Sequence, residues 1–326
     1  MEQRALGRTG LTVPAIVFGA GAVGGAVFTG EPAARTAVVR RALALGIDWI
    51  DTASMYGDGA SEENLGRILP ELRAAPRVST KVRLAPEDLD DIPAAVERSL
   101  DASLGRLRRD AVTLFQLHNR IEDVRDGRTG ALGVDDVLGA GGVADALERV
   151  RAAGRTQLIG FTGLGDADAL HAVLASGRFD TVQAYYNLLN PSAGRAVPAA
   201  FPAYDYRRLI TAAEREGVGV LVIRVLAAGA IGGAAPRAGG RPLSPGSAAE
   251  DDLRRAAAAA AALAGEPGTM PQRAVRFALD TPGVSGVLVG FSNVAQVDEA
   301  AAAADLPPLS ASALATLERL WEGDFR

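Results

Sequence analysis

Four side chains between positions 51 and 118 have the chemistry to move a proton and to polarise a carbonyl group. Asp51 ends an apolar segment that begins at Ile47, and Tyr56 follows in a stretch of loop composition. Lys81 lies near the end of the predicted strand 77–82, and His118 directly follows the predicted strand 112–117. Short apolar runs of this kind are typical of buried strands. We therefore expect the carboxylate, the ammonium group and the imidazole at strand ends, with the phenol on a loop between them.

Lys81 is the only lysine in a chain whose 34 basic residues are otherwise all arginine. Arginine is a broad planar fork that stays charged, whereas lysine is a compact cation whose pKa neighbouring groups can move. The lone lysine therefore indicates a position that arginine cannot fill, with chance retention of a surface lysine as the alternative.

The four residue types fit one another as an acid–base group. A phenol titrates near pH 10, and an adjacent ammonium group favours its ionised form. We expect Lys81 to serve Tyr56 in this way, Asp51 to hold Lys81 charged and oriented, and His118 to donate to a carbonyl oxygen. Each residue taken singly also has a structural explanation: a capping Asp, a packing Tyr, a solvated Lys or a His bound to loop backbone. The second histidine, His171, lies in a helical stretch and is expected to be structural.

Strands and helices alternate along the whole chain. Eight short apolar segments precede helical ones, at Ile16, Trp49, Val78, Val112, Leu158, Val182, Val220 and Val287. This order predicts an α/β fold, a (β/α)8 TIM barrel formed by one domain over residues 1–326. Residues 4–13 are predicted to form an N-terminal β-hairpin, and extra helices are expected at 251–264 and 311–321. A doubly wound open sheet is the alternative, but the glycine run 19–25 lacks the acidic partner of a dinucleotide fingerprint.

A barrel brings the ends of all its strands to one rim, where active sites form. Asp51, Lys81 and His118 would then meet on the second, third and fourth strands. Residues 120–142 and 227–247 are expected to set substrate specificity on this rim, and the first segment is a candidate lid. Ser61 is predicted to cap the helix that follows Tyr56.

Composition excludes several other functions. The net charge is −5 and the pI about 5.3, with no long basic stretch, so nucleic-acid binding is not expected. The absence of cysteine excludes disulfides, thiolate metal sites and a Cys nucleophile, and no metal site is predicted. No signal peptide or membrane-spanning segment is found, so we expect a cytoplasmic protein without a membrane partner. The sequence does not predict its oligomeric state.

Together these residues resemble the aldo-keto reductase family over essentially the whole chain. The matching motifs are Asp51-Thr52-Ala53 with Tyr56-Gly57, Ser61-Glu62, Leu65-Gly66, Ser79-Thr80-Lys81, Gln116-Leu117-His118 and Gly290-Phe291-Ser292-Asn293. The resemblance implies a barrel closed at its bottom by the hairpin, and a catalytic tetrad of Asp51, Tyr56, Lys81 and His118. It also implies hydride transfer between a nicotinamide coenzyme and a small aldehyde, ketone or alcohol, sugars included, with Tyr56 as the proton donor.

The resemblance also implies where the coenzyme would bind. The positions are Gly19, Ala20, Asp51, Thr162, Gln183, Ile223, Arg224, Leu226, Gly290, Ser292, Asn293, Gln296 and Glu299. Thr162-Gly163 stands where the family has Ser-Asn, and residues 223–226 read Ile-Arg-Val-Leu where Tyr-Ser-Pro-Leu is common. NADP(H) is expected on family grounds, with NAD(H) as a usable substitute, because residues 290–296 contain no cation to pair with a 2′-phosphate.

Two other functions fit parts of the pattern. A barrel that binds nicotinamide coenzyme but acts as a regulatory or redox-sensing subunit would carry the same tetrad with little turnover. A phosphate-binding barrel enzyme such as an isomerase would leave Tyr56 and Lys81 unexplained.

Overall fold

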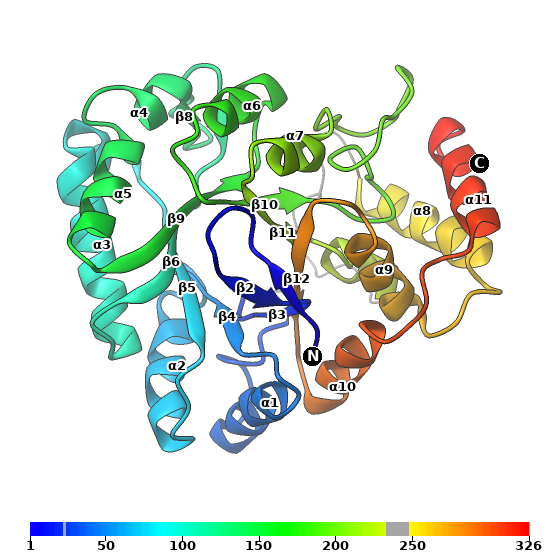
Figure 1. The fold of residues 1–326 in the computed structure, drawn as a ribbon, viewed down its shortest axis with the longest axis horizontal. Helices are drawn as coiled ribbons and strands as arrows, with labels where there is room; N and C mark the ends of the chain where they lie inside the picture. The colour runs from blue at the N-terminus through cyan, green and yellow to red at the C-terminus, as the bar shows by residue number, and fades with distance from the viewer. Residues whose placement is uncertain (22–23, 233–247, 326) are drawn as a thin grey trace.

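A computed structural model describes residues 1–21, 24–232 and 248–325. Within these residues, eight parallel strands close into a barrel (Figure 1). They are β3 (Ile16–Gly19), β4 (Trp49–Asp51), β5 (Arg77–Val82), β6 (Val112–Leu117), β9 (Thr156–Gly163), β10 (Thr181–Tyr185), β11 (Gly219–Ile223) and β12 (Val284–Gly290). Their order around the barrel is β10-β11-β12-β3-β4-β5-β6-β9. The predicted (β/α)8 barrel is confirmed, and the open-sheet alternative is excluded.

Helices surround the barrel and follow its strands in turn (Figure 1). The outer ring consists of α1 (Pro32–Ala44), α2 (Ala60–Glu71), α3 (Ile92–Leu107), α5 (Val143–Ala152), α6 (Ala167–Ala175), α7 (Leu209–Arg215), α9 (Met270–Leu279) and α10 (Val294–Ala303). Each amphipathic helix turns an apolar stripe toward the strands; α9, for example, buries Val275, Phe277 and Leu279. The extra helices α8 (Ala249–Ala262) and α11 (Ala311–Glu322) pack together beside the ring. No helix in the described part of the chain is long and apolar enough to span a membrane.

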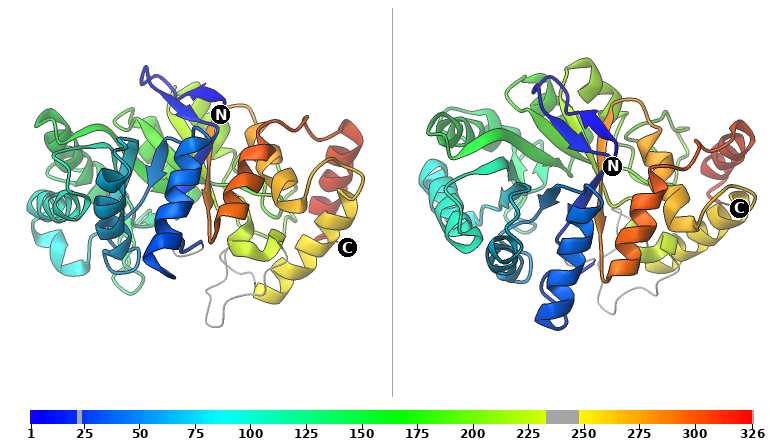
Figure 2. Two further views of the ribbon diagram at one scale, coloured as in Figure 1. Left: turned by 90° about the horizontal axis from the view of Figure 1, so that it is seen from below. Right: turned by 60° about the horizontal axis from the view of Figure 1, so that its bottom comes forward.

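β1 (Gln3–Ala5) and β2 (Thr12–Pro14) pair antiparallel as the predicted N-terminal hairpin. Gly7 turns the chain with a φ of 52°, a conformation that glycine adopts without strain. Leu6 and Val13 are fully buried and pack with side chains of the barrel interior. The hairpin therefore closes the N-terminal end of the barrel, where Figure 2 shows it in dark blue.

Two connections on the opposite rim were predicted to be specificity loops. Residues 120–142 contain β7 (Ile121–Glu122), β8 (Leu132–Gly133) and α4 (Val134–Leu138), so this candidate lid is a structured segment. Residues 227–247 begin with the 3-10 helix η2 (Ala227–Gly232), and 233–247 lie outside the described residues, as do 22–23 of the glycine run. A further 3-10 helix, η1 (Pro86–Asp90), precedes α3.

The prediction that Ser61 caps α2 is wrong. The helix begins at Ala60, and its N-cap is Gly59 with a φ of 87°. Glycine adopts this left-handed conformation without strain, so the chain can turn into the helix already at Gly59. Ser61 is therefore the second residue of the helix and lies in its first turn. Ser61 is fully buried there, and its hydroxyl faces the ends of the barrel strands.

Candidate active site

Three neighbouring strands bring the four predicted catalytic residues to one rim. Asp51 is the last residue of β4, Lys81 is the penultimate residue of β5, and His118 directly follows β6. Pairing continues past the strands, because the His118 backbone N–H donates to the carbonyl of Val82 at 2.8 Å. Tyr56, on the loop after β4, lies half-buried beside them. The barrel thus gathers all four side chains at the carboxyl ends of its strands, where barrel active sites form.

Lys81 is the centre of the group. Its Nζ donates to Asp51 Oδ2 at 2.5 Å, to the carbonyl of Thr52 at 2.8 Å and to the Tyr56 hydroxyl at 3.1 Å. An ammonium group has three donors, so each is used once. Burial opposes the charge on this fully buried group, but the Asp51 carboxylate and Tyr56 outweigh it and raise the pKa of Lys81. Lys81 is therefore held as a cation aimed at the phenol.

Asp51 is fixed on its other side by barrel-interior amides. Its Oδ1 accepts from Gln183 Nε2 at 2.8 Å and, more weakly, from Gln116 Nε2 at 3.4 Å. Burial raises the pKa of the Asp51 carboxyl, while the charge of Lys81 and the hydrogen bonds from Lys81, Gln183 and Ser79 act against that rise. Ser79 is itself held by the indole N–H of Trp49 at 2.7 Å. These contacts leave the carboxylate one orientation, with Oδ2 toward Lys81.

His118 is neutral at physiological pH. Burial first, then the charges of Lys81, Arg83 and Arg224, lower its pKa to about 3. Its ring stands edge-on to that of Tyr56, with centroids 5.8 Å apart and planes at 82°. Nδ1 is buried without a hydrogen-bond partner in the described part of the chain. A neutral imidazole beside the phenol can donate one N–H to a substrate oxygen, but it is not an acid at neutral pH.

The first turn of α2 supports the site from behind. The buried Ser61 hydroxyl donates to the carbonyl of Ala20 at 3.0 Å and lies 2.8 Å from the hydroxyl of Thr52. Thr52 in turn supplies the carbonyl that accepts from Lys81. Ser61 therefore links the loops that follow β3 and β4, a role that neither its predicted place as a helix cap nor its place in the Ser61-Glu62 motif indicates.

Glu62 extends this support to β5. Its carboxylate is fully buried, accepts from the Thr80 hydroxyl at 2.5 Å, and is paired with Arg106 of α3 at 2.7 Å. Thr80 immediately precedes Lys81, so the network fixes the strand segment that carries the lysine. Sequence analysis included Glu62 and Gln116 only as members of the matching motifs and gave them no role, because their contacts to Thr80, Arg106 and Asp51 are all remote in sequence.

Thr162 and Gln183 fit the carboxamide end of a nicotinamide coenzyme. They are paired in register, Thr162 as the penultimate residue of β9 and Gln183 as the middle residue of β10. Thr162 is 1% exposed and its Oγ1 has no hydrogen-bond partner among the described residues. An unpaired buried hydroxyl is costly, so one at the rim indicates a polar group that binds there.

The segment predicted to bind phosphate, residues 290–293, begins at the last residue of β12 and leads into α10. Asn293 caps α10 by accepting from the Gln296 backbone N–H at 3.0 Å, and the Gln296 side chain accepts from the Ser292 N–H at 2.7 Å. The Ser292 hydroxyl donates to the carbonyl of Gly24 at 2.8 Å. A Cβ on Gly24 would lie 2.2 Å from the nitrogen of Phe291, so only glycine permits this close approach. A helix N-terminus beside closely packed loops suits an anionic group such as a pyrophosphate.

The remaining predicted coenzyme positions are spread along this rim. Gly19 and Gly290 end the adjacent strands β3 and β12, and Ala20 follows Gly19. Ile223 ends β11 half-buried, and Leu226 is half-buried just beyond it. Arg224 is exposed in the left-handed conformation, with a φ of 60°, and the Asn187 side chain donates to its carbonyl at 3.0 Å. Glu299, by contrast, binds the Thr269 hydroxyl of the α9 cap at 2.6 Å and does not join the tetrad.

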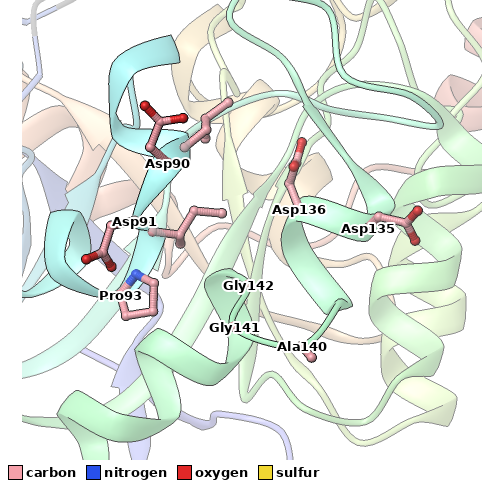
Figure 3. A pocket seen from close by; sticks show the side chains of 10 residues that line it. Asp90, Asp91, Pro93, Asp135, Asp136, Ala140, Gly141 and Gly142 are labelled. Atoms are coloured by element: carbon pink, nitrogen blue, oxygen red, sulfur yellow. The ribbon is translucent and has the colours of Figure 1, made fainter.

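A separate depression lies between the start of α3 and the α4–α5 connection (Figure 3). Its lining includes Asp90, Asp91, Asp135 and Asp136, and no tetrad residue. Asp91 caps α3 through the N–H of Ala94 at 3.1 Å, which gives that carboxylate a structural role.

Known proteins are similar to this chain in sequence, and solved structures are similar to it in architecture. L-galactose dehydrogenase from Arabidopsis thaliana is 32% identical over 93% of this chain and 88% of its own length. L-glyceraldehyde 3-phosphate reductase from Escherichia coli is 27% identical over 98% of this chain and 92% of its own length. Among solved structures, an aldo-keto reductase from Bacillus halodurans in its holo form has a TM-score of 0.72 at 21% identity, covering 98% of this chain and 96% of its own.

An aldo-keto reductase from Klebsiella pneumoniae in complex with NADPH has a TM-score of 0.69 at 23% identity, covering 99% of this chain and 96% of its own. At these identities the two structures establish the fold alone. The model of the aldo/keto reductase family matches residues 15–322, almost the whole chain. Together with the sequence relatives, this match shows that the chain belongs to the aldo/keto reductase family of oxidoreductases.

Proposed function

We propose that the protein reduces a small aldehyde or ketone to the alcohol with NADPH, and catalyses the reverse reaction with NADP⁺. The observation that carries the proposal is the single buried ammonium group of Lys81, which bridges Asp51 at 2.5 Å and the Tyr56 hydroxyl at 3.1 Å. The coenzyme, when bound, supplies or accepts the hydride. For each carbonyl reduced, one hydride and one proton enter the product alcohol.

The residues of this chain move the proton and stabilise the developing charge. In reduction the Tyr56 hydroxyl donates its proton to the carbonyl oxygen, and Lys81 stabilises the phenolate that remains. The neutral His118 donates an N–H to the same oxygen and orients the carbonyl. In oxidation the Tyr56 phenolate accepts the proton of the alcohol, while Asp51 keeps Lys81 in place throughout.

The residues that would bind the coenzyme lie along the same rim, and among them Thr162 has a buried hydroxyl without a partner in the described part of the chain. Thr162 and Gln183 would hold the nicotinamide amide, with Ile223 against the ring and Gly19 and Ala20 beside it. Arg224, Leu226 and residues 290–293 would hold the pyrophosphate. Gln296 and Glu299 would reach toward the adenosine, which for Glu299 requires release of Thr269.

The preference for NADPH is expected to be modest. The Klebsiella pneumoniae relative was solved with NADPH, which supports this coenzyme for the present chain. The loop 290–296 offers only neutral donors to a 2′-phosphate, and these bind about half as strongly as charged ones. NADH is therefore proposed as a usable substitute.

A substrate panel tests the proposal. Initial rates are measured by coenzyme absorbance with aliphatic, aromatic and sugar aldehydes, and with the corresponding alcohols, using both coenzymes. The sugar substrate in the name of the Arabidopsis thaliana relative is the reason to include L-galactose in the oxidation direction. Turnover that is lost in Tyr56→Phe supports the proposal. Tight coenzyme binding without turnover of any compound would favour a regulatory or redox-sensing barrel.

A further inference from the structure

Arg83 is the first residue beyond β5, and the proposed chemistry gives it no role. Side chains alternate along a strand, so Arg83 follows Lys81 on the same face, two residues nearer the mouth. The alternation holds past the end of β5, because the His118 N–H still pairs with the carbonyl of Val82 at 2.8 Å. Arg83 is therefore placed over the barrel mouth, next to His118.

The surroundings of Arg83 leave its guanidinium available. The residue is exposed, and its Nη2 lies 3.7 Å from where a Cβ on Gly130 would be. Gly130 is fixed in turn, since its carbonyl accepts from the Asn119 side chain at 3.0 Å. Nearby Arg120 is paired with Glu122 at 3.1 Å, whereas Arg83 has no carboxylate partner in the part of the chain that the structure describes.

Two arginines, Arg83 and Arg224, flank His118 from opposite sides of the barrel mouth. β5 and β11 lie opposite each other in the barrel order, and Arg83 and Arg224 directly follow them. Both guanidinium groups are close enough to His118 to lower its pKa, after burial and Lys81. Arg224 follows β11, on the side of the β12 loop where we place the coenzyme phosphates. Arg83 lies on the opposite side of the barrel, away from the proposed phosphate contacts. Its guanidinium is therefore placed to contact the substrate and not the coenzyme.

We propose that Arg83 binds an anionic group, a carboxylate or a phosphate, on the carbonyl substrate. The inference rests on the proposed function, because that reaction places the substrate carbonyl beside Tyr56 and His118. A guanidinium matches both anions with paired, charge-assisted hydrogen bonds, and lysine at the same position would offer only a point charge. With a neutral substrate, the Arg83 guanidinium would stay hydrated and make no charged contact.

Two matched pairs of aldehydes test the inference. Values of kcat/KM are measured with saturating NADPH for succinic semialdehyde against butanal, and for glyceraldehyde 3-phosphate against glyceraldehyde. We expect the anionic member of one pair to be preferred by about 10-fold, equal to about 1.4 kcal/mol. The favoured pair distinguishes a carboxylate from a phosphate. Arg83→Gln should abolish the preference and Arg83→Lys should keep part of it, whereas Arg40→Gln, an equal charge change on α1, should not alter it.

Several outcomes would overturn the inference: ratios near one in both pairs for the wild type, an unchanged ratio in Arg83→Gln, or an equal loss in Arg40→Gln. Turnover of butanal or glyceraldehyde tests the proposed function separately. If the wild type reduces none of the four, calorimetry with succinate and inorganic phosphate on the NADP⁺ complex still decides. Binding that Arg83→Gln weakens about 10-fold supports the anion site, and equal or absent binding in both proteins contradicts it.

Discussion

Removing the charge of Lys81 separates its role in stability from its role in catalysis. In Lys81→Met the Asp51 carboxylate stays buried and keeps only its neutral donors, chiefly Gln183 at 2.8 Å. Breaking a buried ion pair by removing one partner costs about 3–5 kcal/mol of unfolding free energy. The same change removes the cation 3.1 Å from the Tyr56 hydroxyl, so kcat should fall by about 10²–10⁴, the range for general acid catalysis.

The double variant Asp51→Asn/Lys81→Met is compared with Lys81→Met to separate the effect on stability from the effect on catalysis. It removes both charges, so the penalty of the unpaired carboxylate disappears, and most of the lost stability, roughly 2 kcal/mol or more, should return. Activity should not return, because the phenol still lacks its cation. Lys81→Arg keeps the charge and tests the shape of the cation. The three acceptors of Lys81 surround a single nitrogen atom, and the planar guanidinium of arginine cannot donate to all three of them. The kcat of Lys81→Arg should therefore also fall.

Urea unfolding at pH 7 gives the stabilities, and initial rates with a good aldehyde substrate give kcat. The reasoning is refuted if the double variant is no more stable than Lys81→Met. That result would mean that burying the Asp51 carboxylate without Lys81 does not lower the free energy of unfolding. It is equally refuted if Lys81→Arg or the double variant keeps wild-type kcat. Coenzyme dissociation constants serve as a control, since Lys81 makes no contact in the proposed phosphate segment.

Three further outcomes are expected. Tyr56→Phe should lower kcat for carbonyl reduction by about 10²–10⁴ while the coenzyme Kd, measured by fluorescence titration, stays within about twofold; wild-type kcat would remove the phenol from the mechanism. The pKa of His118 is lowered from 6.5 to about 3 in the folded protein, so below pH 6.5 the unfolded chain binds a proton that the folded chain does not. Stability should thus fall by about 2 kcal/mol from pH 7 to pH 5 in urea unfolding, and His118→Gln should lose this component; the same slope in both proteins would contradict the buried, neutral ring. Gln296→Arg should raise the NADPH-to-NADH ratio of kcat/KM by about 10-fold, because a charged donor would reach the 2′-phosphate, and an unchanged ratio would place that phosphate elsewhere.

The barrel could be predicted because its signals are local. Each strand is a short segment with apolar or β-branched residues, and the segments 77–82, 112–117 and 181–185 match β5, β6 and β10 residue for residue. Closure then follows from eight repeats of one unit, and closure alone brings Asp51, Lys81 and His118 to one rim. Three residues far apart in the sequence could be grouped without any knowledge of their side-chain contacts.

The supporting contacts could not be predicted because they depend on exact helix starts and on side-chain pairs across elements. Ser61 was assigned a cap since Ser before acidic residues is a common helix start, and the left-handed Gly59 moved that start. Glu62 meets Thr80 and Arg106 only after α2 and α3 are docked on β5. Arg83 could not be singled out from the sequence either, because it is one of many arginines. Only its place directly after β5, at the mouth of the barrel, distinguishes it.

The energetics of the Lys81–Asp51 pair favour a chemical role over a structural one. Both side chains are almost fully buried, and taking two charges out of water costs several kcal/mol per ion before their attraction offsets it. Apolar side chains of similar volume would serve stability as well or better at these positions. They could not, however, hold a cation 3.1 Å from the hydroxyl of Tyr56, which is half-buried where the barrel interior meets solvent. The desolvation that weakens the fold at this point also strengthens the effect of Lys81 on the phenol, because the same charge acts more strongly at low dielectric.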